Sequence, residues 1–193
     1  MSCVTITRED LEYCEGEHQI AGFYTDAYLV DESDIQTFPK MADDPTLTTE
    51  EQAAVTTLGL TAAEKKVTLI GNITLKSGKK FTRLPILNDS GQLEYNRIKP
   101  NSPAVKTDYS CNIQYTSKNE GILAGWTKAI VLLRPLEGNP KLLGRPGNSV
   151  QIDEEKGKNG SSSDGEKMIS LKFSAKPFRA ADYKGTIQLT PAT

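Results

Sequence analysis

The chain has 193 residues, of which 37% are apolar and 25% are charged, and its formal net charge is −2. This balance excludes a disordered chain of low hydrophobicity and high net charge, and no apolar run approaches the roughly 20 residues that cross a bilayer. The first residues lack the basic and apolar regions of a signal peptide. We therefore expect a single soluble domain over residues 1–193, made in the cytoplasm, with no membrane partner.

The charge is distributed unevenly along the sequence. Residues 1–64 contain 14 acidic and two basic residues, a net charge of −12, whereas residues 65–193 have a net charge of +10. Such a split predicts opposed acidic and basic surfaces through which two copies meet head to tail. The alternative is that the two halves interleave in the fold, so that their charges mix.

The first third of the chain predicts one strand and one helix. Residues 1–48 form an acidic N-terminal region of open role, with a short strand at Ala27–Val30. Thr49–Gln52 fits a capping box, in which a Thr and a Gln three residues later satisfy the first N–H groups of a helix. The sequence therefore predicts a helix over Glu50–Leu58 that ends at Gly59.

A β-hairpin is predicted over residues 67–87. Val67–Leu75 is rich in β-branched residues and alternates in polarity, Lys76–Lys79 is a polar turn with a glycine, and Phe81–Leu87 returns. Pro85 cannot donate to a strand ladder, which indicates a sheet edge or a bulge.

The rest of the chain predicts further short strands and a long loop. Alternating or continuous apolar patterns predict strands, with a short helix between the first two. Residues 153–167 contain no large apolar residue, which indicates a flexible loop. Together these elements predict a mainly β fold, a sandwich or barrel of about eight or nine strands with one or two short helices. The strands are Asp108–Thr116, Ala129–Leu133 (covered on both faces), Leu142–Gly144, Ser149–Ile152, Met168–Ser174 and Thr186–Thr190, and the helix is Lys118–Trp126.

Cysteine and histidine usage indicates no reactive centre. Cys3, Cys14 and Cys111 are odd in number and form no CxxC pair, which argues against a disulfide framework or a zinc site. His18 is the only histidine, and the sequence places no nucleophile beside it.

Two other segments match binding motifs only in part. The acidic residues at 31–34 lack the spacing of a calcium loop. Ser77–Lys80 lacks the first glycine and the final Ser or Thr of a phosphate loop. We therefore expect a protein that is not an enzyme and has no catalytic residue, cofactor or metal ion.

The order of features from about residue 50 to residue 190 resembles the tail tube proteins encoded by phages and prophages of Bacteroidetes bacteria. The resemblance covers most of the chain, although residues 1–48 have no clear counterpart in it. The segments that support it, after the Thr/Glu helix, are Val67–Leu75, Lys76–Phe81, Arg83–Pro85, Tyr109–Tyr115, Asn119–Gly125, Ala129–Leu133, Leu142–Asn148, Met168–Phe173 and Phe178–Gly185.

The resemblance implies a structural virion protein of the phage tail, made in the cytoplasm of the host bacterium. Six copies would form a ring, and rings would stack into a hollow tube through which genome DNA passes without being read. Other tail proteins, such as the tape measure and the terminator, would be further partners. Ring closure would continue a sheet from one copy into the next, and stacking would use the loop 153–167. The residues expected at inter-subunit contacts are Asp153, Glu154, Glu155, Lys156, Lys158, Lys79, Lys80 and Arg83.

Two alternatives remain open from the sequence. One is a carbohydrate- or host-binding β-sandwich module, although the single Trp, Trp126, lies in an apolar cluster rather than among exposed aromatic residues. The other is a tail-terminator or head–tail joining protein, which would form one ring and stop.

Overall fold

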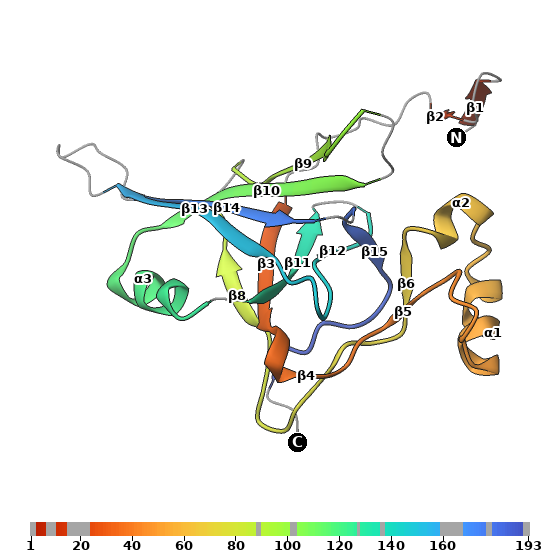
Figure 1. Cartoon of the computed structure of the whole chain (residues 1–193), viewed down its shortest axis with the longest axis horizontal. Helices are drawn as coiled ribbons and strands as arrows, with labels where there is room; N and C mark the ends of the chain where they lie inside the picture. The colour runs from red at the N-terminus through yellow and green to blue at the C-terminus, as the bar shows by residue number, and fades with distance from the viewer. Residues whose placement is uncertain are drawn as a thin grey trace.

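The computed structural model describes residues 3–6, 11–14, 24–87, 90–100, 104–126, 128–135, 138–158, 168–176 and 179–190. Over these residues the chain is mainly β, which confirms the predicted fold class. Two sheets form the body, and their strands cross at a steep angle (Figure 1).

The smaller sheet of the body has four strands in the order β13-β14-β10-β9. Every neighbouring pair in it is antiparallel. Its strands are β9 (Gln92–Arg97), β10 (Val105–Gln114), β13 (Gln151–Lys158) and β14 (Met168–Ala175).

The larger sheet has seven strands in the order β5-β6-β15-β12-β11-β3-β8. Its pairs are antiparallel except for β15 and β6, which are parallel. Its strands are β3 (Tyr24–Asp31), β5 (Lys40–Met41), β6 (Thr68–Ile70), β8 (Thr82–Pro85), β11 (Ala129–Pro135), β12 (Lys141–Leu143) and β15 (Ala181–Tyr183).

Two further pairs of strands form small sheets of their own. β1 (Cys3–Ile6) pairs only with β2 (Leu11–Cys14) among the described strands, and β4 (Ile35–Thr37) pairs with β7 (Thr74–Leu75). The 3₁₀ helix η1 (Glu32–Asp34) connects β3 to β4.

The main core lies between the two sheets, because each sheet turns alternate apolar side chains towards the other. On β10, Tyr109, Cys111 and Ile113 are buried, as their spacing predicts. The rings of Tyr109 and Phe173 stack with their centroids 6.1 Å apart.

The larger sheet is buried on its other face as well. All five residues of Ala129–Leu133 are buried, since alternate side chains enter the main core and a second cluster on the opposite face. The second cluster includes Tyr28, Leu132 and Tyr183. The prediction that this strand is covered on both faces is confirmed.

Helix α1 (Thr49–Thr57) forms where the sequence predicts it, with its cap one residue earlier. Thr48 is the N-cap, and its capping box uses Glu51 rather than Gln52. The helix stops before Gly59, whose φ of 62° few other residues adopt.

The structure also contains one predicted and one unpredicted short helix. α3 (Ser117–Ala124) confirms the second predicted helix, and its Leu123 is buried in the main core. α2 (Ala62–Lys65) was not predicted, although Thr61 and Glu64 form a capping box of their own.

The prediction of a hairpin over residues 67–87 is wrong. β6, β7 and β8 pair with three different sets of partners, and none of them pairs with another. The sequence pattern identified the extended segments but not the strands with which they pair. Pro85 does lie on an edge strand, because β8 pairs with β3 alone among the described strands.

Two predicted boundaries near the C-terminus also change. Residues 153–158 continue β13 and pair with β14, so the prediction of a loop starting at residue 153 is wrong for them. The remainder of that predicted loop, 159–167, lies outside the described residues. Thr186–Thr190 is not a strand, and β15 lies before it. With several strands of only two to four residues, the described strands number fifteen rather than eight or nine.

Candidate functional site

The four-stranded sheet has two outer strands whose free edges pair with no other described strand. β13 pairs with β14 alone, and β9 pairs with β10 alone. The two strands have eight and six residues, which is long for unprotected edges. Their unpaired N–H and C=O groups are a template for another strand. Among the described strands, none covers the outer side of β9 or β13.

The face of this sheet that points away from the core is polar. Alternation places the residues of β10 and β14 that do not enter the core on this face, and only Met168, at the end of β14, is apolar among them. The polar positions are Lys106, Asp108, Ser110, Asn112 and Gln114 on β10, and Ser170, Lys172 and Ser174 on β14.

An ion network lies at the centre of this polar face. Nζ of Lys106 is 2.9 Å from Oδ1 of Asp108 and 3.2 Å from Oδ2 of Asp153. Nζ of Lys172 is 3.6 Å from Oδ2 of Asp108. The Ser174 hydroxyl lies within hydrogen-bond distance of both carboxylates and donates its one proton to either. The network contains two positive and two negative groups, so its charges balance.

The network favours the charged forms of Lys106, Asp108 and Asp153. Burial raises the pKa of Asp108, but hydrogen bonds from Ser174 and Lys106 and the charges of both lysines outweigh it and lower the pKa below its usual value. The hydrogen bond from Ser174 lowers the pKa of Asp153, and the hydrogen bond to Asp108 raises the pKa of Lys106. The buried Asp108, only 5% exposed, is thus a paired charge.

The network also ties the outer strand β13 to the interior of the sheet. The β13–β14 register shifts between Ile152 and Glu154, which is a bulge at Asp153. The carboxylate of Asp153 reaches Lys106 on β10, two strands away. The ion pair of Asp153 therefore holds the bulge in place, and the bulge sets the direction of the outer strand β13.

The first group of predicted contact residues lies on this edge. Asp153, Glu154, Glu155, Lys156 and Lys158 all belong to β13. The structure places them on a paired strand, where the sequence predicts a loop. Their backbone is therefore available for sheet continuation.

The second group lies at the edge of the larger sheet, next to or on β8. Lys79 forms an ion pair with Asp34 at 2.9 Å, and Arg83 forms one with Asp26 at 2.8 Å. Lys80 is exposed. Both ion pairs join the acidic first third of the chain to the basic remainder, so the charges of the two halves mix in this region.

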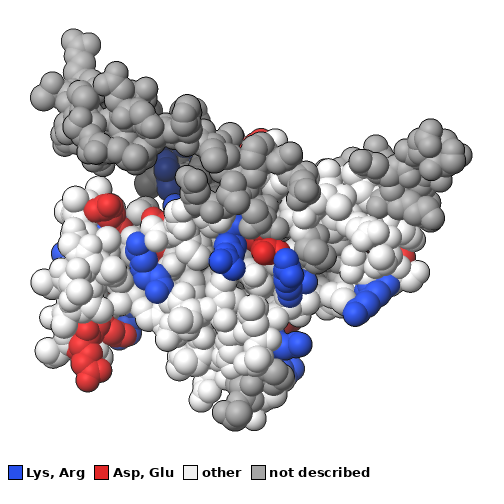
Figure 2. Space-filling model, turned by 180° about the vertical axis from the view of Figure 1, so that it is seen from behind, with Lys and Arg blue, Asp and Glu red and all other residues white. Residues whose placement is uncertain are grey.

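The charges are separated elsewhere on the surface. Figure 2 shows basic side chains across the middle of one face and acidic side chains at the end where α1 and α2 lie. Glu50 and Glu51 stand in the first turn of α1, and Glu64 stands in that of α2. The two sequence-based alternatives therefore each describe part of the molecule.

The acidic residues at 31–34 do not converge on a common point. Asp31 caps η1 by accepting a hydrogen bond from the N–H of Ser33 at 2.8 Å. Glu32 accepts one from the N–H of Gly147 at 2.7 Å, and Asp34 pairs with a lysine as above. No group of three His, Cys, Asp or Glu side chains in the described part of the chain is arranged to hold a metal ion.

The cysteines occupy two different settings. Cys111 is buried in the main core, and burial raises the pKa of its thiol to about 12. The thiol is therefore un-ionised at neutral pH and is not a nucleophile. Cys3 and Cys14 are register partners in the β1–β2 pair, and His18 lies outside the described residues.

Sequence reasoning missed the ion network. The alternation of β10 and β14 identified which residues face away from the core, but Lys106, Asp108 and Ser174 look like ordinary exposed residues until the strands are placed side by side. Asp153 was predicted as a contact residue because it lies in a polar segment. No pattern in the neighbouring sequence indicates the bulge at this residue.

Among the described helices none is long and apolar enough to cross a membrane. A comparison with known proteins finds no matching family model, no matching curated protein and no matching solved structure.

Proposed function

We propose that this chain is the subunit of a phage tail tube, a structural virion protein that forms hexameric rings which stack into a conduit for DNA. The observation that supports this best is the four-stranded antiparallel sheet, which is open at both edges and polar on its free face. The order of features along the chain, which resembles tail tube proteins, supplies the number of copies in a ring.

The strand directions suit ring closure. Three antiparallel steps separate β13 from β9, so the two edge strands run in opposite directions. Rotation about a ring axis preserves the sense of every strand relative to that axis. β9 of one copy would therefore meet β13 of the next copy antiparallel, and the whole closed sheet would be antiparallel. Such a contact is heterologous and closes by rotation.

The shape of the subunit supports one choice of the face that would line the lumen. The inner face of the four-stranded sheet is covered by the seven-stranded sheet and by Leu123 of α3. That bulk fits only on the outside of a closed ring, since the space per copy increases with radius. The polar face would then line the channel, where water is in contact with it.

The balanced charges of the polar face suit a channel through which DNA passes without binding to the wall. A basic channel would bind DNA by releasing counterions from its phosphates. The lysines of the network are instead neutralised by Asp108 and Asp153 at 2.9–3.6 Å. The central part of the face would neither attract phosphates strongly nor read bases.

The test is negative-stain electron microscopy of the purified full-length chain over a range of concentrations. Hollow rods, or stacked rings with sixfold symmetry, are the expected result. Single rings that never stack would favour a terminator or joining protein. A chain that stays monomeric at high concentration would contradict the proposal, and a glycan-binding screen would then test the binding-module alternative.

A further inference from the structure

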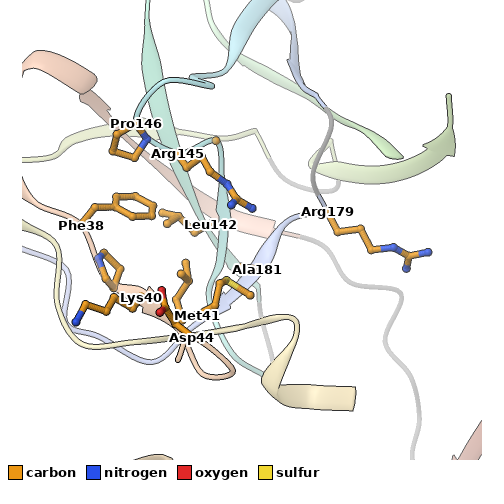
Figure 3. Close-up of a pocket in the computed structure, with 12 residues that line it drawn as sticks. Phe38, Lys40, Met41, Asp44, Leu142, Arg145, Pro146, Arg179 and Ala181 are labelled. Atoms are coloured by element: carbon orange, nitrogen blue, oxygen red, sulfur yellow. The ribbon is translucent and has the colours of Figure 1, made fainter. Parts of the chain in front are cut away.

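An apolar pocket of about 330 Å³ opens beside the outer strand β5 of the seven-stranded sheet. Figure 3 shows Phe38, Leu142 and Pro146 facing one another around it. The described residues that line the pocket include no cysteine, histidine or hydroxyl side chain, and its one lysine, Lys40, pairs with Glu51 at 3.1 Å. The pocket therefore offers no group suited to covalent chemistry, and the thiols of the chain lie elsewhere.

The β1–β2 pair places two of the three cysteines directly opposite each other. In its antiparallel register Cys3 is the partner of Cys14, at the open end of the hairpin, and Ile6 is the partner of Leu11 next to the turn. Directly opposite residues of an antiparallel pair have Cα atoms about 4.5–5.5 Å apart. Disulfides occur at Cα separations of about 4.4–6.8 Å. The register of the hairpin therefore meets the backbone requirement of a disulfide.

The third thiol does not compete for this bond. Cys111 lies on β10 in the main core and is 3% exposed. Burial raises the pKa of its thiol to about 12, so almost none of it is thiolate at neutral pH, and the thiolate is the form that exchanges with disulfides. The odd number of cysteines, which by count argues against a disulfide, is thus one buried thiol and one facing pair.

The β1–β2 hairpin would gain more from a covalent link than a strand inside a large sheet. Its two strands have four residues each and pair with no other described strand. A two-stranded hairpin is marginally stable in water by itself. A link between its open ends would reduce the freedom of the unpaired chain and so favour the paired form.

We propose that Cys3 and Cys14 form a reversible disulfide that holds the β1–β2 hairpin in register under oxidising conditions. One thiolate attacks a small-molecule disulfide such as oxidised glutathione, breaks its S–S bond and releases one small thiol. The second thiolate attacks the resulting mixed disulfide, forms the Cys3–Cys14 bond and releases the second small thiol. The two cysteines lose two electrons and two protons, which reduce the small disulfide to two thiols.

The redox state of the surroundings decides which form is present. Thiols persist in a reducing cytosol, whereas disulfides form and persist in oxidising surroundings. Under the proposed function, the chain would pass from the first to the second when the virion leaves the cell. The bond itself depends only on the hairpin, so failure of the tube proposal would leave it standing, and the reverse also holds.

Peptide mapping of the full-length chain tests the bond. The protein is equilibrated in glutathione buffers of increasing oxidised fraction, free thiols are alkylated, and a tryptic digest is measured by mass spectrometry without reduction. Trypsin cuts after Arg8, so Cys3 lies in peptide 1–8 and Cys14 lies in peptide 9–40. We expect these peptides to be linked, in a monomer whose intact mass is lower by two hydrogen atoms. Two free thiols in the most oxidising buffer, stable glutathione adducts at both cysteines, or links between copies would overturn the proposal.

A register-shifted variant separates strand pairing from nearness in sequence. Tyr13→Cys with Cys14→Ser moves the thiol by one residue, so that it stands opposite Val4 and on the other face of the pair. Its equilibrium constant for disulfide formation with glutathione should be lower than that of the unsubstituted chain by about tenfold or more, because a misaligned disulfide is strained. Equal constants would show that the thiols meet without the hairpin and would contradict the proposal.

Hydrogen–deuterium exchange tests whether the bond holds the hairpin. Backbone amides of β1 and β2 should exchange more slowly in the oxidised protein than in the reduced protein, because local opening becomes rarer. Amides of β10 are the internal control and should exchange equally in both forms. Equal exchange of the hairpin amides in both forms would contradict the role assigned to the disulfide.

Discussion

The hydroxyl of Tyr183 accepts a hydrogen bond from the backbone N–H of Ile73 at 3.0 Å, across 110 residues of sequence. The same hydroxyl donates to the carbonyl oxygen of Thr186 at 3.0 Å. The Tyr183 side chain is 1% exposed and packs in the second core cluster. One side chain therefore joins β15 and the segment that follows it to the segment before β7, which is distant in sequence.

Tyr183→Phe should lower the free energy of unfolding by about 1–3 kcal/mol, because it leaves the N–H of Ile73 buried without an acceptor. Urea denaturation followed by fluorescence measures the change. Tyr28→Phe is the control, since Tyr28 is buried in the same cluster and its hydroxyl has no hydrogen bond to another described residue. An equal loss in both variants would show that packing, not the hydrogen bond, is responsible.

Gly185→Ala should destabilise the protein by steric conflict. A Cβ at residue 185 would lie 2.4 Å from the hydroxyl oxygen of Tyr183 and 2.5 Å from the carbonyl oxygen of Gly71, and the backbone atom has little freedom to move. Gly121→Ala is the matched control: it lies in α3 with nothing within 4 Å of the new Cβ. Thermal unfolding should show a lower Tm for the first variant and an unchanged or higher Tm for the second, since Ala favours helix by about 1 kcal/mol.

Asp108→Asn should make stability less sensitive to acid. The folded-state pKa of Asp108 lies below its unfolded value, so its contribution is complete above about pH 4 and is lost as the pH falls through the folded pKa. At pH 7 the free energy of unfolding of the variant should be lower by about 1.5–3 kcal/mol, because a hydrogen bond to a charged group contributes about this much to stability. Urea unfolding of both proteins at pH 7 and at pH 3 should show that this difference shrinks in acid.

Asp43→Asn is the control for that titration, because Asp43 is exposed and forms no ion pair among the described residues. It should leave the unfolding free energy unchanged within about 0.5 kcal/mol at either pH. A difference between Asp108→Asn and the unsubstituted protein that stays constant from pH 7 to pH 3 would contradict the role assigned to the network.

Arg97→Pro should block assembly without unfolding the subunit. The N–H of Ile98 bonds to the carbonyl of Ala104 at 3.1 Å, so by alternation the N–H of Arg97 points to the free edge of β9. Proline at residue 97 removes a donor that only a neighbouring strand would use. Size-exclusion chromatography should show folded monomers for this variant.

Arg97→Ala keeps the N–H and should assemble like the unsubstituted chain. If the alanine variant also fails to assemble, the side chain rather than the backbone edge makes the contact. If Arg97→Pro assembles normally, β9 is not a joint between copies.

The candidate site was partly predictable from the sequence. The polar character of residues 153–158 selected them as contact residues, and they do lie on the free edge β13. Their strand conformation was missed, because a polar strand without an apolar face gives no alternating signal. Pro85 correctly indicated an edge strand. Proline has no N–H to donate to a neighbouring strand, and this holds whatever the fold.

The sequence by itself determined the local features of this protein. Alternation placed Tyr109, Cys111 and Ile113 on one buried face, a continuous apolar run at Ala129–Leu133 indicated burial on both faces, and a cluster of Thr and Glu began α1. Each of these depends on forces between residues a few positions apart, such as helix capping or the two-residue period of a strand.

Only the tertiary structure decided which strands are neighbours. β6, β7 and β8 follow one another in sequence and pair with three different sets of partners. Ser174 contacts both Asp108 and Asp153 only because β14 lies between β10 and β13. Strand pairing depends on contacts distant in sequence, which a local pattern cannot specify. The free edges, the balanced polar face and the pocket beside β5 therefore came from the fold.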